Sequence, residues 1–463
     1  MGTRGDLTGL SELLQGELIL PGDPDYDGAR QLWNGVFDTR PAAIARCVGA
    51  SDVAKAVRFG RELGLPIAVR GGGHNVAGTG SADGGLVLDL SAMRTVAVDP
   101  DERTVVVGGG ATLGDVDGAT QAHGLAVPFG VVSETGVAGL TLSGGMGWLR
   151  RRHGLTCDNL IRAEVVTADG QIVTASEDGN PDLLWGLRGG GGNFGVVTSF
   201  TLRSYPVGPD VFLCFVIYPA ERALDVFGGV RDFMAAAPDD VAPIAFLGRV
   251  PEGEAFPAAA HGRPFAAIGC VHPGQPAEGE RAFRRLRDLG EPIVDLSDTL
   301  PYVQAQRLLD EDYPAGRRYY WKSIELAGLS DDAIRILMAS AEVSPSGLST
   351  IDVWFQGGAM AAVAPNATAY GDRSAPILIG VEANWEGAQH DDANIAWARG
   401  CVEDLRPFST GGTYLNFPGF LDEHDAQVQA AYGANLERLT RLKREYDPDN
   451  VFRINHNVAP APG

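Results

Sequence analysis

The feature that most constrains this sequence is a glycine triplet followed by histidine, placed directly after an apolar segment. Residues 65–69 are typical of a β-strand, and the loop after them consists of Arg70, Gly71, Gly72, Gly73, His74 and Asn75. Consecutive glycines free the backbone to adopt positive φ and let a phosphate approach bare amides, while the histidine adds a ring nitrogen. The loop therefore suits a nucleotide's pyrophosphate, although a tight turn without a ligand is the simpler alternative.

The common ATP and NAD binding modes fit this loop poorly. No Lys-Ser/Thr pair closes it, and no Gly-x-Gly-x-x-Gly stands between a strand and a helix here. Two further glycine clusters, at residues 130–147 and 189–192, lie in the same half of the chain. Three unrelated turns explain this density poorly, so we expect several loops to converge on one extended, flat, phosphate-bearing ligand.

Composition argues against several classes of protein. With 463 residues the chain is too long for one core, and its net charge of −22 opposes binding to nucleic acid or anionic lipid. The five cysteines are scattered without a Cys-x-x-Cys pair, so we predict neither a disulfide framework nor a metal site. No run of about 18 apolar residues occurs. We expect a soluble cytoplasmic protein that uses no membrane, and the sequence does not predict its oligomeric state.

The segment before the glycine loop predicts a strand, a helix and a second strand. We place the first strand at residues 44–48, a helix N-capped by Ser51 and ending at Gly64, and the second strand at residues 65–69. Short β-rich runs then suggest a small sheet with antiparallel meanders. These runs cover residues 86–90, 96–98 and 104–107.

The glycine clusters stop after the Pro-Val-Gly-Pro segment at residues 206–209, which indicates a domain boundary near residue 207. Two β-like segments, residues 350–356 and 377–384, then belong to a second domain, which we predict to be a sheet with helices on one side. The polar, turn-rich segment from residue 446 is strongly patterned, so we expect it to return to the first domain.

Seven ordered blocks together resemble the berberine-bridge-enzyme-like branch of the vanillyl-alcohol-oxidase flavoproteins, and in particular its bacterial members with a single covalent flavin link. The blocks are residues 70–74, 144–155, 158–160, 180–185, 188–197, 414–417 and 446–450. The resemblance implies an α+β fold with a two-subdomain PCMH-type FAD-binding domain and a substrate domain whose antiparallel sheet is covered by helices. It places the FAD-binding part at residues 1–206, the substrate domain at 207–409, and a returning C-terminal segment at 410–463.

The resemblance implies that His74 is bonded covalently to the 8α-methyl carbon of FAD, which fixes the flavin and raises its redox potential. Many members make a second bond through a cysteine, but Val132 stands at that place and cannot form a thioether. We therefore expect a single tether. Cys157 is interpreted as a buried small hydrophobe in preference to a flavin ligand.

Thr135 matches the family position that governs access of dioxygen to the flavin. Threonine has nearly the shape of valine, so we expect space for dioxygen to remain, and its hydroxyl could hydrogen-bond near flavin N5. An oxygenase that works through a flavin N5-oxide therefore stays open beside an oxidase. The remaining predicted cofactor contacts are Arg70, Gly71, Gly72, Gly73, Asn75, Gly78, Gly136, Gly139, Gly144, Gly145, Asn193, Gly195, Val196, Val197, Tyr414, Asn416, Asn455 and Asn457.

Alcohol oxidation needs a base, and the family tyrosine often used for this is replaced by Phe417. Tyr414 remains a candidate contact for substrate or flavin. Asp352 and Glu382 each stand among apolar residues of a predicted strand, so either could be buried with a raised pKa and act as the base. The alternative for both is an exposed position on a half-buried sheet.

These inferences predict an FAD-linked oxidase that transfers a hydride from a small organic, secondary-metabolite substrate to flavin N5, with dioxygen as electron acceptor. Sugar and amine substrates are competitors. A dehydrogenase that uses another acceptor, and a flavin-holding protein without turnover, are the remaining alternatives.

Overall fold

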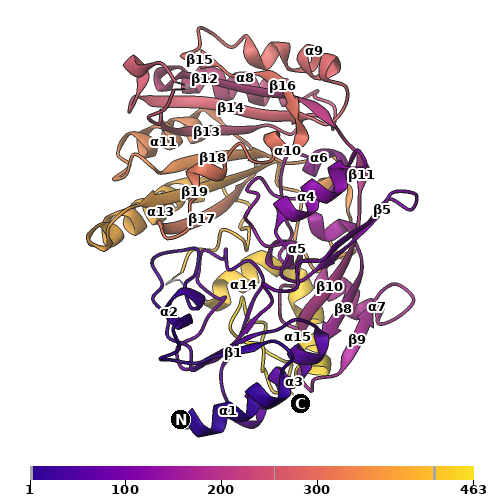
Figure 1. Ribbon diagram of the computed structural model, residues 1–463. Coiled ribbons are helices and arrows are strands. Elements are labelled where there is room, and N and C mark those ends of the chain that lie inside the picture. The colour runs from indigo at the N-terminus through magenta and orange to yellow at the C-terminus, as the bar shows by residue number, and fades with distance from the viewer. Residues whose placement is uncertain (1–3, 255, 421–423, 463) are drawn as a thin grey trace.

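The computed structural model describes residues 4–254, 256–420 and 424–462 (Figure 1). The first sheet has the order β1 (Glu17–Ile19), β2 (Ala43–Arg46), β4 (Leu86–Asp89), β3 (Ile67–Arg70). Strand β4 pairs in parallel with both β2 and β3, while β1 is antiparallel to β2. Helix α3 (Ala50–Glu62) packs against β3 and β4, and α1 (Arg4–Leu13) packs against α3.

The start of helix α3 corrects one prediction. Gly49, and not Ser51, is the N-cap residue. Asp52 accepts hydrogen bonds from the backbone N–H groups of Gln15 and Gly16 at 2.9 Å each, so its carboxylate fastens the preceding chain to the helix. The helix ends at Glu62 because Gly64 adopts a φ of +65°, a conformation that favours glycine.

The second sheet is antiparallel, with the order β5 (Val96–Asp99), β6 (Thr104–Gly108), β10 (Val196–Arg203), β8 (Leu160–Val166), β9 (Ile172–Ala175). The prediction that the three β-rich runs of residues 86–107 form one small sheet with antiparallel meanders is therefore wrong for β4, which belongs to the parallel first sheet. It is confirmed for β5 and β6, which pair antiparallel. The chain leaves that sheet after β4 and starts the antiparallel one with β5. Helices α4 (Leu113–Gln121), α5 (Val137–Leu142) and α7 (Pro181–Leu187) belong to the same region.

A large antiparallel sheet forms the other half of the molecule (Figure 1). Its order is β15 (Val294–Asp295), β12 (Asp210–Pro219), β14 (Pro264–His272), β13 (Ile244–Arg249), β18 (Thr350–Phe355), β19 (Ile377–Trp385), β17 (Arg318–Leu326), and β16 (Asp298–Pro301) also pairs with β12. Four helices pack on one face: α8 (Ala223–Met234), α9 (Pro276–Arg287), α11 (Asp331–Glu342) and α13 (Asp391–Leu405). The α+β class and the antiparallel sheet covered by helices are thus confirmed.

Strand alternation sorts the side chains of this sheet into two cores. Val353 and Ile379 face the helices, while Trp354 and Leu378 face the N-terminal half. The second core is shared between the halves, because Trp33 and Trp148 from the N-terminal half join it. The face of the sheet that bears no helices is therefore the one that meets the glycine-rich loops.

The chain returns to its first half at the end. Helices α14 (His424–Tyr432) and α15 (Leu436–Tyr446) lie beside the N-terminal half, and α15 packs against α7 (Figure 1). The remaining short elements are α2 (Tyr26–Ala29), α6 (Arg150–His153), α10 (Tyr302–Ala305), α12 (Ala359–Ala362), β7 (Leu125–Ala126) and β11 (Tyr205–Pro206). Across the described residues, no helix combines the length and apolarity needed to span a membrane.

Candidate active site

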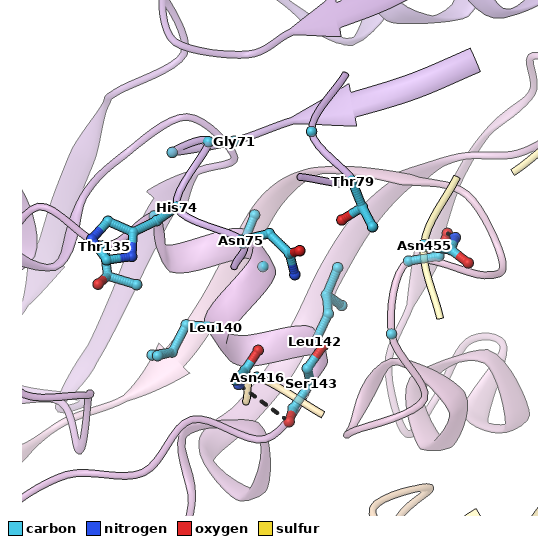
Figure 2. A pocket seen from close by; sticks show the side chains of 18 of the residues that line it. Gly71, His74, Asn75, Thr79, Thr135, Leu140, Leu142, Ser143, Asn416 and Asn455 are labelled. Atoms are coloured by element: carbon cyan, nitrogen blue, oxygen red, sulfur yellow. Dashed lines mark hydrogen bonds between the residues drawn. The ribbon is translucent and has the colours of Figure 1, made fainter. Parts of the chain in front are cut away.

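A cavity lies between the glycine-rich loops and the helix-free face of the large sheet. Figure 2 shows the side of this cavity that the loops line, with His74, Thr135 and Asn416 labelled. It encloses about 1680 Å³ of empty space, a volume that includes its open mouth. All three glycine clusters contribute to its lining, through residues 71–73, Gly136 with Gly139, and Gly191 with Gly192. The predicted convergence of the loops on one site is therefore confirmed.

Two of these loops touch through bare backbone. A Cβ added to Gly72 would lie 2.5 Å from the amide nitrogen of Gly136, and a Cβ added to Gly136 would lie 2.4 Å from the amide nitrogen of Gly72. Gly73 beside this contact has a φ of +68°. Side chains at these positions would push the loops apart, so glycine is required to bring the backbone of both loops to the wall of one cavity.

His74 projects from the first loop into the cavity beside a stack of aromatic rings. Its ring stacks on Trp33 at a centroid distance of 4.0 Å, and the other face of Trp33 stacks on Tyr319 at 3.8 Å. The Nε2 atom of His74 is excluded from solvent and has no hydrogen-bond partner among the described residues. Burial lowers the pKa of His74 to about 4, so the ring is neutral near pH 7 and its nitrogen lone pair is available.

Asp352 and Glu382 line the sheet side of the cavity, on neighbouring strands β18 and β19. Asp352 pairs with Gly380 in register, so Glu382 stands two residues further along on the same face. Both residues are 2% exposed. Burial and the charge of Glu382 raise the pKa of Asp352 well above its usual range, while burial raises the pKa of Glu382 to about 7. The expected burial of both carboxyls is thus observed, and the exposed alternative is wrong.

A tyrosine that the sequence analysis missed supports this carboxyl pair. The Tyr313 hydroxyl donates to Oε2 of Glu382 at 2.7 Å. This bond and a hydrogen bond from Asp352 both favour ionised Glu382, which opposes the effect of burial on its pKa. The charge of Glu382 raises the pKa of Asp352, and the hydrogen bonds to Glu382 lower its own pKa, so the two carboxyl groups titrate as a pair.

Aromatic rings enclose the carboxyl pair. Phe417, at the place of the family tyrosine, packs against Trp321 at 5.2 Å and against Tyr414 at 5.3 Å between ring centroids. Trp354 follows Asp352 by two residues on the same face of β18, and Trp321 stands opposite Glu382 in the strand register. Strand alternation from Asp352 could have predicted Trp354. Tyr313 lies outside any strand or helix, so no periodic signal marked it.

Tyr414 is held by hydrogen bonds to its hydroxyl oxygen. The backbone N–H of Gly145 donates to this oxygen at 3.2 Å, and the side-chain amide of Asn416 donates at 2.8 Å. Asn416 also reaches the carbonyl of Ser143 at 3.4 Å (Figure 2). Burial raises the pKa of Tyr414 to about 12. Its hydroxyl group is therefore protonated near neutral pH and acts as a hydrogen-bond donor, not as a base.

The loop with Val132 and Thr135 lines the cavity and is fastened to the opposite half of the molecule. Asp310 accepts the backbone N–H of Ser133 at 2.7 Å and its hydroxyl at 2.5 Å. Gln306 donates its amide to the carbonyl of Gly130 at 3.2 Å. These bonds fix a loop that has no cysteine to form a second flavin tether.

Most of the predicted site residues border this cavity. The lining includes Arg70, Gly71, Gly72, Gly73, His74, Asn75, Val132, Thr135, Gly136, Gly139, Gly195, Val196, Val197, Asp352, Glu382, Tyr414, Asn416 and Asn455. Other predicted contacts lie outside the lining of the described cavity, namely Gly78, Gly144, Gly145, Cys157, Asn193 and Asn457.

Several of the outer positions have structural roles. A Cβ on Gly144 would lie 2.7 Å from the Tyr370 ring, and one on Gly145 would lie 2.3 Å from the Thr156 hydroxyl. The Asn193 amide donates to the carbonyl of Gly190 at 2.9 Å, which shapes the third glycine loop. Cys157 is fully buried, and burial raises the pKa of its thiol. These residues lie behind the residues that line the cavity and pack against them.

The residues present fit FAD. The bare backbone contact at Gly72 and Gly136 suits the approach of a pyrophosphate, and the buried, unpartnered nitrogen of His74 suits a bond to the flavin. Comparison with known families agrees: residues 41–176 match a family described as FAD binding domain, and residues 413–459 match one described as berberine and berberine like. The fold and site therefore define an FAD-linked oxidoreductase.

The similarity to individual proteins extends over nearly the whole chain. The (R)-6-hydroxynicotine oxidase of Paenarthrobacter nicotinovorans is 32% identical over 460 residues, which cover 96% of this chain and 97% of that protein. The crystal structure of 6-hydroxy-D-nicotine oxidase from Arthrobacter nicotinovorans superposes with a TM-score of 0.87 at 30% identity and covers 97% and 98% of the two chains.

A third comparison concerns the glucooligosaccharide oxidase of Acremonium strictum, whose cofactor is described as 6-S-cysteinyl, 8α-N1-histidyl FAD. It has a TM-score of 0.86 at 25% identity and covers 99% of this chain and 100% of that chain. This chain belongs to the berberine-bridge-enzyme-like family of FAD-linked oxidoreductases.

Proposed function

We propose that this protein is an oxidase that holds FAD covalently through His74 and oxidises a small organic substrate at a carbon next to oxygen or nitrogen, with dioxygen as the electron acceptor. The observation that carries the proposal is that one cavity contains both the buried, unpartnered Nε2 of His74 and the Asp352–Glu382 pair. A tether that fixes the flavin and a base that accepts the proton of an alcohol are the two contributions that this proposal assigns to the protein.

Bound FAD would supply the acceptor for a hydride and pass the electrons on to dioxygen. The protein's part is to bind the substrate, exclude water and move one proton. Glu382 carries the negative charge of the carboxyl pair and accepts the proton that an alcohol must lose, while protonated Asp352 and Tyr313 hold its carboxylate in place. An amine substrate would instead need only to be in its neutral, unprotonated form, and the same carboxylate can accept the proton of its ammonium form.

The covalent link to His74 has two supports. The ring is neutral near pH 7 because burial lowers its pKa to about 4, and a neutral nitrogen is the nucleophilic form. The glucooligosaccharide oxidase that shares this fold carries a histidyl-linked FAD. Val132 stands where a second tether would need cysteine, so the proposal includes one link only.

The substrate region favours a flat or ring-shaped organic molecule. Trp321, Trp354 and Phe417 surround the carboxyl pair and offer apolar faces to a ring. We place the natural substrate among secondary metabolites, with an oligosaccharide or a nitrogen heterocycle as the competing classes, since oxidases named for both are among the relatives.

Dioxygen is proposed as the electron acceptor because Thr135 lines the cavity with a side chain no larger than valine, which leaves space for dioxygen. Its hydroxyl also keeps open an oxygenase, in which an oxygen atom from dioxygen would enter the product. A dehydrogenase with another acceptor is the third outcome. The cytoplasmic location expected from the sequence stays a prediction.

Two measurements test the proposal. Peptide mapping of the acid-precipitated protein should find flavin on the tryptic fragment that contains His74 and on no other fragment. Incubation in air with a panel of secondary metabolites, oligosaccharides and cyclic amines should give hydrogen peroxide in amounts equal to the oxidised product. Free FAD in the acid supernatant would refute the tether. Reduction by substrate without reoxidation in air would indicate the dehydrogenase, and labelled oxygen in the product would indicate the oxygenase.

A further inference from the structure

We propose that Trp33 is the positioning residue that sets the His74 ring for attachment of FAD and ties that ring to the carboxyl pair. The inference rests on the covalent link proposed above. It concerns a residue that the sequence analysis did not select and that lies about forty positions before the glycine loop.

Trp33 fixes the plane of the His74 ring. It is 6% exposed and lies between His74 and Tyr319, with interplanar angles of 21° and 9° to the two rings. Its own backbone N–H donates to the carbonyl of Gly73 at 3.3 Å, next to His74. The indole therefore holds the imidazole by its face, which leaves the ring edge with Nε2 directed away from the stack.

Trp33 is itself fixed from the opposite half of the molecule. Its Nε1–H donates to the carbonyl of Tyr313 at 2.9 Å, and its carbonyl accepts the backbone N–H of Gly316 at 2.8 Å. The neighbouring Asn34 amide donates to the carbonyls of Val76 at 2.7 Å and Tyr319 at 2.9 Å. The segment of residues 33–35 is thus a bridge between the loop of His74 and the start of strand β17.

The bridge ends at the carboxyl pair. Tyr313, whose carbonyl holds the Trp33 indole, donates its hydroxyl to Glu382 at 2.7 Å. A continuous series of direct contacts therefore runs from His74 through Trp33 and Tyr313 to Glu382. The series sets the tether and the base at a fixed separation, because every contact in it is buried or part of a ring stack.

Attachment requires this orientation because the reaction joins two atoms at one ring edge. A bond forms between a nitrogen of His74 and the 8α carbon, and it replaces one methyl C–H bond and the imidazole N–H bond. Two electrons and two protons are released, and dioxygen takes them up as hydrogen peroxide. A ring that rotates freely about its side-chain torsions reaches the required alignment less often, so attachment slows.

The test follows attachment in the full-length chain, made by cell-free translation with FAD and sampled over time, with flavin fluorescence read in denaturing gels. Trp33→Leu removes the ring face and should slow attachment by about two- to tenfold, the range that corresponds to loss of one aromatic pair. Trp33→Phe keeps a ring face and should restore most of the rate. Trp397→Leu is the matched control, since the Trp397 indole also donates to a backbone carbonyl, that of Ser340 at 2.8 Å, but in helix α13.

The outcomes separate this inference from the proposed function. Equal attachment rates in Trp33→Leu and the wild type would overturn the role of Trp33 alone. An equal loss in Trp33→Phe, or in Trp397→Leu, would also overturn it, because the ring face would then not be the cause. A wild-type protein that never retains flavin in the gel would overturn the tether as well as the role of Trp33, while FAD binding measured before denaturation would still support the family assignment.

A second readout is independent of turnover. The midpoint potential of the flavin, measured by dye-coupled reduction of the purified protein, should be lower in Trp33→Leu than in the wild type, because part of its flavin is unattached. The unattached flavin of Trp33→Leu should have the same midpoint potential as the flavin of His74→Ala. A purely structural role of Trp33 would lower the melting temperature without this correlation.

Discussion

The Tyr313 hydroxyl donates a hydrogen bond of 2.7 Å to Oε2 of Glu382, and this bond is buried. Tyr313 follows a short 3₁₀ turn outside the large sheet, whereas Glu382 lies in the middle of strand β19. The bond thus joins a connecting segment to the sheet at the point where two carboxyl groups meet. It opposes the burial that raises the pKa of Glu382 to about 7.

Replacement of Tyr313 by phenylalanine should raise the pKa of Glu382 further. A hydrogen bond to a charged group contributes about 1.5–3 kcal/mol, so the pH at which flavin reduction becomes half-maximal should rise by about one to two pH units. Because the base acts when ionised, the reduction rate rises with pH in both proteins. Anaerobic stopped-flow reduction across pH 5–9 measures the shift.

Tyr319→Phe is the matched control for this experiment. The Tyr319 hydroxyl donates to the carbonyl of Pro314 at 2.6 Å and belongs to the same aromatic cluster. An unchanged pH profile in Tyr313→Phe, or an equal shift in Tyr319→Phe, would contradict the role assigned to the Tyr313–Glu382 bond.

Neutral replacement of the base should slow the reductive step without loss of FAD. Glu382→Gln removes the carboxylate and should lower the rate of flavin reduction by about 10²–10⁴, the usual contribution of a general base. Asp352→Asn keeps a side-chain hydrogen-bond donor next to Glu382, so it should lower the rate of flavin reduction less than Glu382→Gln does. Asp117→Asn serves as control, since burial also raises the pKa of Asp117 to about 7 but Asp117 hydrogen-bonds Gln306 outside the cavity lining. Wild-type rates in both site variants would exclude the carboxyl pair as the base.

The sequence predicted the parts of the site that depend on local pattern. Consecutive glycines mark bare backbone wherever they occur, so the loops at residues 71–73 and 189–192 were recognisable. Alternation in β19 placed Glu382 on the same face as Gly380, and the structure agrees. The resemblance to the flavoprotein family then joined these local features into one FAD site.

The sequence did not predict contacts between distant segments. Trp33 and Tyr313 reach the site only because residues 33–35 bridge two halves of the molecule, and nothing local to either residue indicates it. The same holds for β4, which lies beside β2 and β3 in parallel although it precedes β5 by only a short turn. Sheet membership depends on long-range pairing that periodicity does not contain.

Gly72→Ala should damage the FAD site. The added Cβ would lie 2.5 Å from the Gly136 amide nitrogen and 2.6 Å from its Cα, so the two loops must separate. We expect a stability loss of about 1–3 kcal/mol, as for other overpacked sites, together with a lower flavin-to-protein ratio. Gly118→Ala is the control, because a Cβ there meets no atom within 4 Å. Full flavin content in Gly72→Ala would show that the close contact is not needed for binding.

Thr135→Leu should slow reoxidation of the reduced flavin by dioxygen. The larger side chain fills cavity space that Thr135 leaves open, and an added barrier of about 1.4 kcal/mol would slow the reaction about tenfold. Thr135→Val preserves the shape and should reoxidise at the wild-type rate unless the hydroxyl takes part. Stopped-flow mixing of photoreduced protein with oxygenated buffer measures the rate without a substrate. Equal rates in all three proteins would remove Thr135 from the path of dioxygen.

Glu325→Gln should stabilise the protein in alkaline solution and leave it unchanged in acid. Glu325 is 4% exposed, and burial, followed by the charge of Asp372, raises its pKa to about 7. The folded protein therefore keeps a proton on Glu325 between its ordinary pKa and pH 7, whereas the unfolded chain loses it, so stability falls as pH rises through this window. The loss reaches at most about 3 kcal/mol above pH 7.

Glutamine stays neutral, so the melting temperature of Glu325→Gln should exceed that of the wild type at pH 8 and equal it at pH 4. Glu342→Gln, at an exposed position of α11, should change neither value. A destabilised Glu325→Gln at pH 8 would mean that the carboxylate is paired in the folded state and that burial does not dominate its titration.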